Sequence, residues 1–151
     1  MLHWIFKHFN QLSPAQLYAA MKLRSEVFVV EQDCVYLDAD GKDEHCYHLL
    51  GYMENELICY ARLVPANIAF THISIGRVVT SPAHRGIGAG RQLLIKAIKE
   101  CYTLFGDQPI KIGAQLYLEK FYRSFGFKQS GDGYDEDGIL HIPMILDNEC
   151  Q

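Results

Sequence analysis

The segment that decides the fold reads Ile75-Gly76-Arg77-Val78-Val79-Thr80-Ser81-Pro82-Ala83-His84-Arg85-Gly86-Ile87-Gly88-Ala89-Gly90-Arg91. Its first half is rich in β-branched residues, which predicts a strand over residues 73–80. Its second half is a glycine-rich turn. A helix over residues 88–105 is expected next, because apolar residues recur at helical spacing on one face: Leu93, Leu94, Ala97, Ile98, Cys101 and Leu104.

The chemistry of this turn favours a phosphate group. Gly86, Gly88 and Gly90 lack Cβ atoms, so a ligand can approach the backbone closely. The free N–H groups and the dipole of the following helix attract an anion, and Arg85 and Arg91 add positive charge. A Walker-type loop is absent because Gly-Lys-Ser/Thr is missing, and the G-x-G-x-G spacing departs from the dinucleotide fingerprint G-x-G-x-x-G. From these residues alone, a connection that binds no ligand stays open.

Outward from the turn, the chain predicts further strands over residues 2–9, 47–53, 57–64, 110–114, 127–130 and 141–146. Ser13 is expected to cap a helix that starts at Pro14, with Gln16 completing a capping box and Glu31 at the helix end. Residues 31–44 and 131–138 are expected to be a loop and a turn-rich segment. Another helix is expected over residues 115–125 before Gly126. The order β-α-β-β-β-α-β-α-β-β predicts one α/β domain over residues 1–151, with a mixed sheet of about seven strands.

Composition limits the classes of partner. The chain has 151 residues, a net charge of −4 and a pI of about 5.9, which argues against a nucleic-acid partner and fits a cationic substrate. The five cysteines are odd in number and no two are separated by only two residues, so reduced thiols in the cytoplasm are the simplest interpretation. No apolar run approaches the roughly 18 residues that cross a bilayer, and residues 1–9 lack a secretion signal. We expect a cytoplasmic protein without membrane contact.

The glycine turn resembles the coenzyme A-binding motif of the GNAT superfamily of N-acetyltransferases, V-x-P-x-x-R-G-x-G-x-G/A at a strand-to-helix junction. Residues 80–90 match it, with Thr80 in place of the usual Val. The resemblance implies that the sheet is splayed between its fourth and fifth strands. It implies that backbone amides hold the pyrophosphate at Arg85, Gly86, Ile87, Gly88, Ala89, Gly90 and Arg91. It also implies that Val78, Val79 and Thr80 pair with the pantetheine arm, where one amide polarises the thioester carbonyl.

A second motif lies downstream, where Phe121-Tyr122-Arg123-Ser124-Phe125-Gly126-Phe127 resembles the family's Y-x-x-x-G-F signature. The resemblance implies that Tyr122 is the general acid that protonates the departing thiolate, a group with a pKa near 8.5. The alternative is a core aromatic residue whose hydroxyl is satisfied. Gln115 stands where many relatives carry an Asn that touches the cofactor.

The resemblance covers nearly the whole chain and is most specific for the ElaA-like branch of the family. It depends there on the runs over residues 23–32, 75–78 and 134–142. This branch implies the fold and the donor but no particular acceptor.

The general base has three candidates, Glu31, Glu136 and His141. Each has a structural alternative: an ion pair for Glu31, a solvated turn position for Glu136 and a satisfied core position for His141. Arg62 and Arg77 project from predicted strands and either line an acceptor pocket or form salt bridges with the acidic loop, the polar segment over residues 31–44.

No metal site is expected. His45-Cys46-Tyr47-His48 lacks a second ligand pair, and the spacing of Asp38, Asp40, Gly41 and Asp43 breaks the calcium-loop pattern.

With these residues, the resemblance implies direct transfer of an acetyl group from acetyl-CoA to a primary amine in a ternary complex. The acceptor is a small molecule or a peptide, and the protein is a monomer or a homodimer. A non-catalytic module that binds or senses acyl-CoA is the alternative, because it shares the glycine turn but needs no acid and no acceptor pocket.

Overall fold

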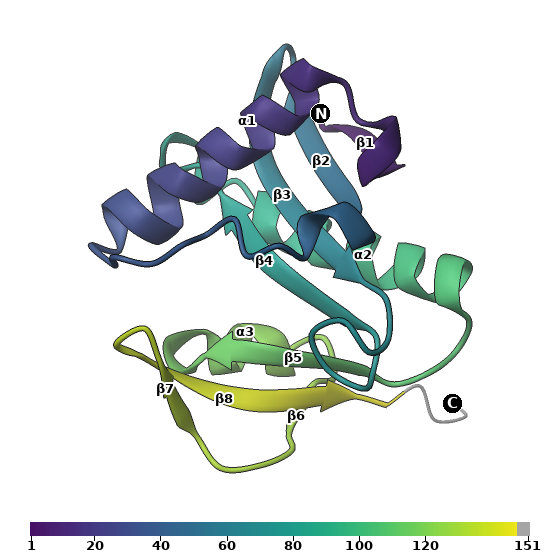
Figure 1. The fold of residues 1–151 in the computed structure, drawn as a ribbon, viewed down its shortest axis with the longest axis vertical. Helices are drawn as coiled ribbons and strands as arrows, with labels where there is room; N and C mark the ends of the chain where they lie inside the picture. The colour runs from purple at the N-terminus through teal and green to yellow at the C-terminus, as the bar shows by residue number, and fades with distance from the viewer. Residues whose placement is uncertain (148–151) are drawn as a thin grey trace.

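Two antiparallel sheets frame the molecule over residues 1–147, the part of the chain that the computed structural model describes (Figure 1). The first sheet has the order β1 (His3–His8), β2 (Tyr47–Met53), β3 (Glu56–Val64) and β4 (Ser74–Thr80). In the second sheet, β8 (Ile139–Leu146) lies between β5 (Ile110–Gln115) and β6 (Lys128–Gln129), and β7 (Tyr134–Glu136) also pairs with β8.

The two sheets meet at one end of β4 and β5. Ile73 and Ile110 form a parallel bridge, and the Lys111 backbone N–H donates to the Ile73 carbonyl at 3.0 Å. From that end β4 and β5 diverge (Figure 1). The expected mixed architecture and its splay between the fourth and fifth strands are therefore confirmed.

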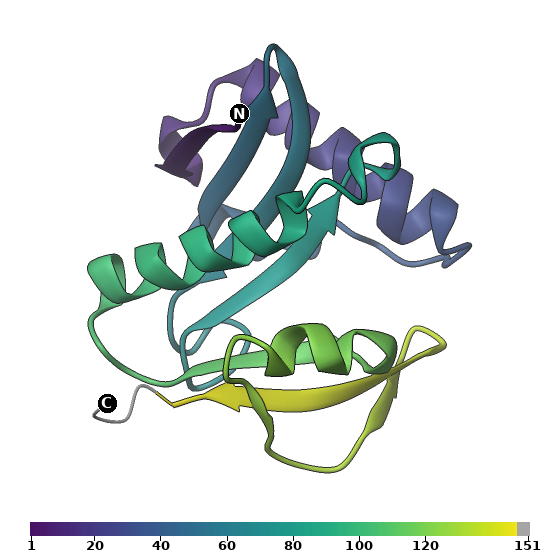
Figure 2. The ribbon, with the colours of Figure 1, turned by 180° about the vertical axis from the view of Figure 1, so that it is seen from behind.

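Helices cover opposite faces of the first sheet. α1 (Pro14–Arg24) lies on one face and continues into a π-helical turn, Ser25–Glu31, whereas α2 (Ala89–Phe105) lies on the other (Figures 1 and 2). The predicted apolar stripe of α2 buries Leu93, Leu94, Ala97 and Cys101, but Leu104 is 37% exposed. The core beneath α2 extends into the second sheet through β5 and β8, so one apolar cluster joins the two sheets.

The ends of the helices follow their sequence signals. The Ser13 hydroxyl accepts from the Gln16 N–H at 3.1 Å, and the Gln16 side chain accepts from the Ser13 N–H at 2.9 Å, which is the expected capping box. Gly88 caps the start of α2 with φ 82°, a left-handed conformation that glycine adopts without steric cost.

Two predicted elements differ in the structure. Gln115 is the last residue of β5, where it pairs with His141, so the expected helix over residues 115–125 is a 3₁₀ turn (Leu116–Leu118) followed by α3 (Glu119–Arg123). The turn-rich segment contains β7, which makes eight strands over residues 1–147 instead of about seven. Asp137 and Gly138 both have positive φ and connect β7 to β8, as Asp-Gly pairs do in tight hairpins.

Within residues 1–147, no helix is both long and apolar enough to span a membrane.

Gly51 of β2 is packed closely between β1 and β3. A Cβ atom there would lie 2.5 Å from the Cys59 Sγ and 2.7 Å from the Trp4 ring. Because both neighbours are packed, we expect Gly51→Ala to lower the free energy of unfolding by about 1–3 kcal/mol, measured by denaturant unfolding.

Gly76→Ala in β4 is the matched control, because a Cβ atom there meets nothing within 4 Å. Its free energy of unfolding should stay within about 0.5 kcal/mol of wild type. Equal losses in the two variants would contradict the packing argument.

Candidate active site

A cavity of about 1210 Å³ opens where β4 and β5 separate. Its walls come from these two strands, the π-helical turn, the glycine turn, α3 and the β7–β8 hairpin, and we call it the central cleft. The volume exceeds that of most small-molecule sites, which suits a large ligand together with a second reactant.

The glycine turn forms one end of the central cleft. Gly86 and Gly88 have φ of 86° and 82°, and a Cβ atom at either would meet nothing within 4 Å, so backbone conformation and not space demands glycine there. All but one of the predicted cofactor residues line the cleft: Val78, Val79, Thr80, Arg85, Gly86, Gly88, Ala89, Gly90, Arg91 and Gln115. Ile87 is not among the lining residues, and its side chain is 51% exposed.

Glu31 is paired with the arginine of this turn. Both Arg85 Nη atoms donate to the Glu31 carboxylate at 2.7 Å. The hydrogen bonds from Arg85 hold the pKa of Glu31 below its usual value, and the pairing raises the pKa of Arg85. A carboxylate with a lowered pKa is a weak proton acceptor, so this geometry favours the ion-pair alternative for Glu31.

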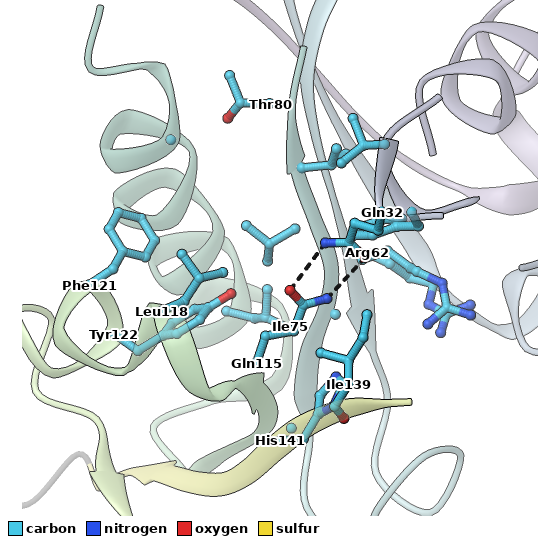
Figure 3. A pocket seen from close by; sticks show the side chains of 18 of the residues that line it. Gln32, Arg62, Ile75, Thr80, Gln115, Leu118, Phe121, Tyr122, Ile139 and His141 are labelled. Atoms are coloured by element: carbon cyan, nitrogen blue, oxygen red, sulfur yellow. Dashed lines mark hydrogen bonds between the residues drawn. The ribbon is translucent and has the colours of Figure 1, made fainter. Parts of the chain in front are cut away.

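Tyr122 is buried in the core, but its hydroxyl reaches the central cleft. Its ring packs edge-on against Phe121 and Phe127, and the residue is only 6% exposed. Its hydroxyl points into the central cleft (Figure 3) and has no hydrogen-bond partner among residues 1–147. Burial, with a smaller contribution from Tyr117, raises the pKa of Tyr122, so the hydroxyl stays protonated at neutral pH.

Gln115 reaches across the central cleft to Gln32, a residue that sequence reasoning missed. The two side-chain amides exchange hydrogen bonds of 3.1 and 3.3 Å (Figure 3). Gln32 follows the π-helical turn and donates its backbone N–H to the Val27 carbonyl at 3.0 Å, five residues back. The wide π-helical turn places Gln32 at the cleft, and no local sequence pattern predicts a π-helix.

His141 and Glu136 come together at the β7–β8 hairpin. His141 is 7% exposed, and its Nδ1 lies 2.8 Å from the Ile139 carbonyl, which can only accept. The neutral ring therefore carries its proton on Nδ1 and presents a lone pair on Nε2. That nitrogen lies 3.7 Å from the Glu136 carboxylate, and the Tyr134 ring stacks on the imidazole.

A balanced ion-pair network forms the wall beside β3 and β4. It joins three arginines to three aspartates of the acidic loop: Arg24, Arg62, Arg77, Asp38, Asp40 and Asp43. Arg62 binds Asp40 through two hydrogen bonds of 2.9 Å, and it contacts Asp43 at 2.9 Å. Arg62 and Arg77 thus line the central cleft while the aspartates neutralise their charges. The aspartate oxygens that the calcium alternative invoked are engaged by arginine.

Comparisons with known proteins identify related chains with the same fold. A family model described as acetyltransferase (GNAT) domain matches residues 7–148. Protein ElaA of Escherichia coli is 44% identical over 146 residues, which cover 95% of each chain. Its crystal structure superposes with a TM-score of 0.91, at 42% identity over 97% of this chain and 100% of that one. An acyl-CoA N-acyltransferase from Pseudomonas aeruginosa also gives a TM-score of 0.91, at 39% identity over 96% and 99% of the two chains.

The aspartate network links stability to pH. Burial alone would raise the pKa of Asp40 and Asp43, but hydrogen bonds and charge from Arg62 and Arg24 outweigh it and lower both pKa values. Carboxylates of this kind stabilise the fold above their unfolded pKa of about 3.9, and the contribution is lost as pH falls through the lower folded values. We therefore expect the free energy of unfolding to decrease below about pH 4.

The Asp40→Asn variant tests the assignment by denaturant unfolding between about pH 6 and about pH 2.5. It should lose roughly 1–3 kcal/mol at pH 6, because Arg62 loses a charged acceptor. Its stability should then fall less steeply with acid than that of wild type. Parallel curves for the two proteins would contradict the role of Asp40.

Proposed function

Because the chain belongs to the GNAT acetyltransferase family, we propose that it transfers an acetyl group from acetyl-CoA to a primary amine, by direct attack in a ternary complex. One observation carries the proposal: a single cleft contains a glycine turn at a helix start, a protonated tyrosine hydroxyl and an imidazole lone pair. A single N-acetyltransferase domain over residues 1–151 performs the reaction. A cytoplasmic location and a monomeric or homodimeric state remain predictions.

The donor is held by the backbone. The first amides of α2 and the side chains of Arg85 and Arg91 suit the pyrophosphate. In the described structure β4 pairs along its length with β3 only, so its other edge offers unpaired N–H and C=O groups to the cleft. An extended arm with amide groups can add to such an edge as an extra strand, here along Val78 to Thr80.

Acetyl-CoA supplies a thioester carbonyl that a neutral amine can attack. Tyr122 acts as the general acid, because its hydroxyl is protonated at neutral pH and lies in the cleft, where it can donate to the departing thiolate. Its ring is clamped by Phe121 and Phe127, so the hydroxyl is held in one direction before the donor arrives.

His141 takes the proton from the amine. Its Nε2 lone pair is fixed by the Nδ1 hydrogen bond, and Glu136 at 3.7 Å stabilises the imidazolium that forms. Because His141 Nε2 and the Glu136 carboxylate are 3.7 Å apart, one amine nitrogen can lie within hydrogen-bond distance of both. Glu136 is therefore an electrostatic partner of the base, while Glu31 belongs to the pyrophosphate end through Arg85.

The charges near the hairpin favour a cationic acceptor. Arg62 and Arg77 are neutralised by aspartates, whereas the lining residues Glu136 and Asp137 have no arginine or lysine partner among residues 1–147. A small molecule or a peptide with a primary amine fits this balance, because carboxylates attract an ammonium group before it loses its proton.

The experiment is a free-thiol release assay with acetyl-CoA and a panel of polyamines, amino acids, aminoglycosides and peptides. Thiol release that depends on one amine class supports the transferase. Tight binding of acetyl-CoA without turnover on any amine would favour the non-catalytic module instead.

Tyr122→Phe tests the acid. The change removes only the hydroxyl, so the packing against Phe121 and Phe127 survives. We expect kcat to fall by about 10²-fold or more, while the Kd for acetyl-CoA from calorimetry stays nearly the same. Tyr18→Phe is the control, because Tyr18 is 72% exposed on α1. An unchanged kcat at all pH values would show that the acid is wrongly assigned.

His141→Gln and Glu31→Gln separate the base candidates. Glutamine has no basic lone pair, so His141→Gln should lower kcat by about 10²-fold with little change in donor binding. Glu31→Gln frees Arg85 and should change the Kd for acetyl-CoA but not kcat at saturating donor. A loss of kcat confined to Glu31→Gln would reverse the two assignments.

A further inference from the structure

Arg77 has a backbone conformation that is rare for its residue type. It lies inside β4 with φ 49°, in the left-handed region, where residues other than glycine are strained. Tyr60 pairs with Val79 and Arg62 with Gly76, so the single residue Ala61 of β3 faces two residues of β4. This is a β-bulge, and the left-handed position of such bulges is ordinarily occupied by glycine.

The side chain of Arg77 is held tightly enough to explain why the strain persists. Its Nε lies 2.8 Å from Asp38 Oδ1, and its Nη2 donates to the Asp38 carbonyl at 3.0 Å and to Asp40 at 3.3 Å. The guanidinium stacks over the Tyr36 ring at 5.6 Å. Asp38 is in turn fixed by Arg24, which is fully buried. Contacts of the Arg77 side chain with Asp38 and Asp40 thus connect β4 to the loop between the π-helical turn and β2.

The bulge changes which groups β4 presents to each side. Ile75 and Val78 pack with the same core beneath α2, although residues three apart point to opposite faces of a regular strand. Val79 faces the other core, beneath α1. The extra residue of the bulge shifts the alternation of side chains between the two faces of β4 by one position, just before Val78 to Thr80. It thereby also determines which backbone N–H groups of these residues point into the central cleft.

We propose that Arg77 is a positioning residue: held by Asp38 and Asp40, it maintains the left-handed bulge that directs the backbone N–H groups of Val78 to Thr80 toward the thioester. The inference rests on the proposed function only in taking this edge as the docking site of the donor. Direct binding of a substrate carboxylate is a weaker role for Arg77, because two aspartates already neutralise its charge.

The experiment compares Arg77→Gly with Arg77→Ala. Both variants lose the guanidinium, but glycine adopts the left-handed conformation freely and alanine does not. We expect coenzyme A to bind Arg77→Gly within about threefold of wild type, and Arg77→Ala about tenfold more weakly than Arg77→Gly, by calorimetry. Once an acceptor is found, kcat should follow the same order, with the acceptor KM similar in the two variants.

Glu54 provides the matched control, because it also has a positive φ, 57°, but lies in the β2–β3 turn outside the residues that line the cleft. Glu54→Gly and Glu54→Ala should both bind coenzyme A as wild type does. If Arg77→Ala does not fold, Arg77→Lys replaces it, since lysine keeps the Cβ atom but cannot span both aspartates.

Equal weakening in Arg77→Gly and Arg77→Ala, or wild-type binding in both, would overturn the positioning role while leaving the proposed function intact. Failure of wild-type protein to bind coenzyme A would instead overturn the proposed function, and the positioning role with it.

Discussion

The separation of β4 from β5 is the constraint on which the rest of the structure depends. Two neighbouring strands that part after one bridge leave facing rows of N–H and C=O groups without partners. Such an edge is costly when dry and attracts another extended chain when open. The gap cannot close by sliding the sheets together, because one apolar cluster beneath α2 includes residues of both and fixes their spacing. The result is a cleft between two paired sheets, and all the predicted site residues except Ile87 line it.

The arginine–aspartate network holds the acidic loop against β3 and β4 beside the open cleft. Removing three charge pairs from water is expensive, so the network contributes little net stability compared with an apolar wall of the same volume. The network instead fixes the position of the acidic loop, which has little regular structure of its own: each of its three aspartates contacts two of the arginines. Arg62 of β3 and Arg77 of β4 both bind aspartates of this loop, so the loop and the two strands together form one wall of the cleft.

Local patterns predicted the parts of the molecule that are locally determined. The glycine turn, the capping box of α1 and the apolar stripe of α2 all follow from neighbours within one or two turns of chain. The pairing of Glu31 with Arg85 joins residues 54 positions apart, and that of Gln32 with Gln115 joins residues 83 apart, so no short pattern could reveal them. β7 was missed although its Asp-Gly turn was visible, because a strand of three residues carries almost no periodic signal. The family resemblance supplied the roles that spacing alone left open.

The two halves of the chain divide the work of the proposed reaction. The glycine turn and the bulged edge of β4 come from the first sheet and α2, whereas Tyr122, Gln115 and His141 come from α3, β5 and β8. The structure prepares the two groups by different means: burial retains the proton on Tyr122, while the Ile139 carbonyl fixes the tautomer of the neutral His141 ring. A donor lying along β4 would bring its thioester between the halves. The splay that leaves the backbone of β4 unpaired therefore also opens the cleft that both Tyr122 and His141 line.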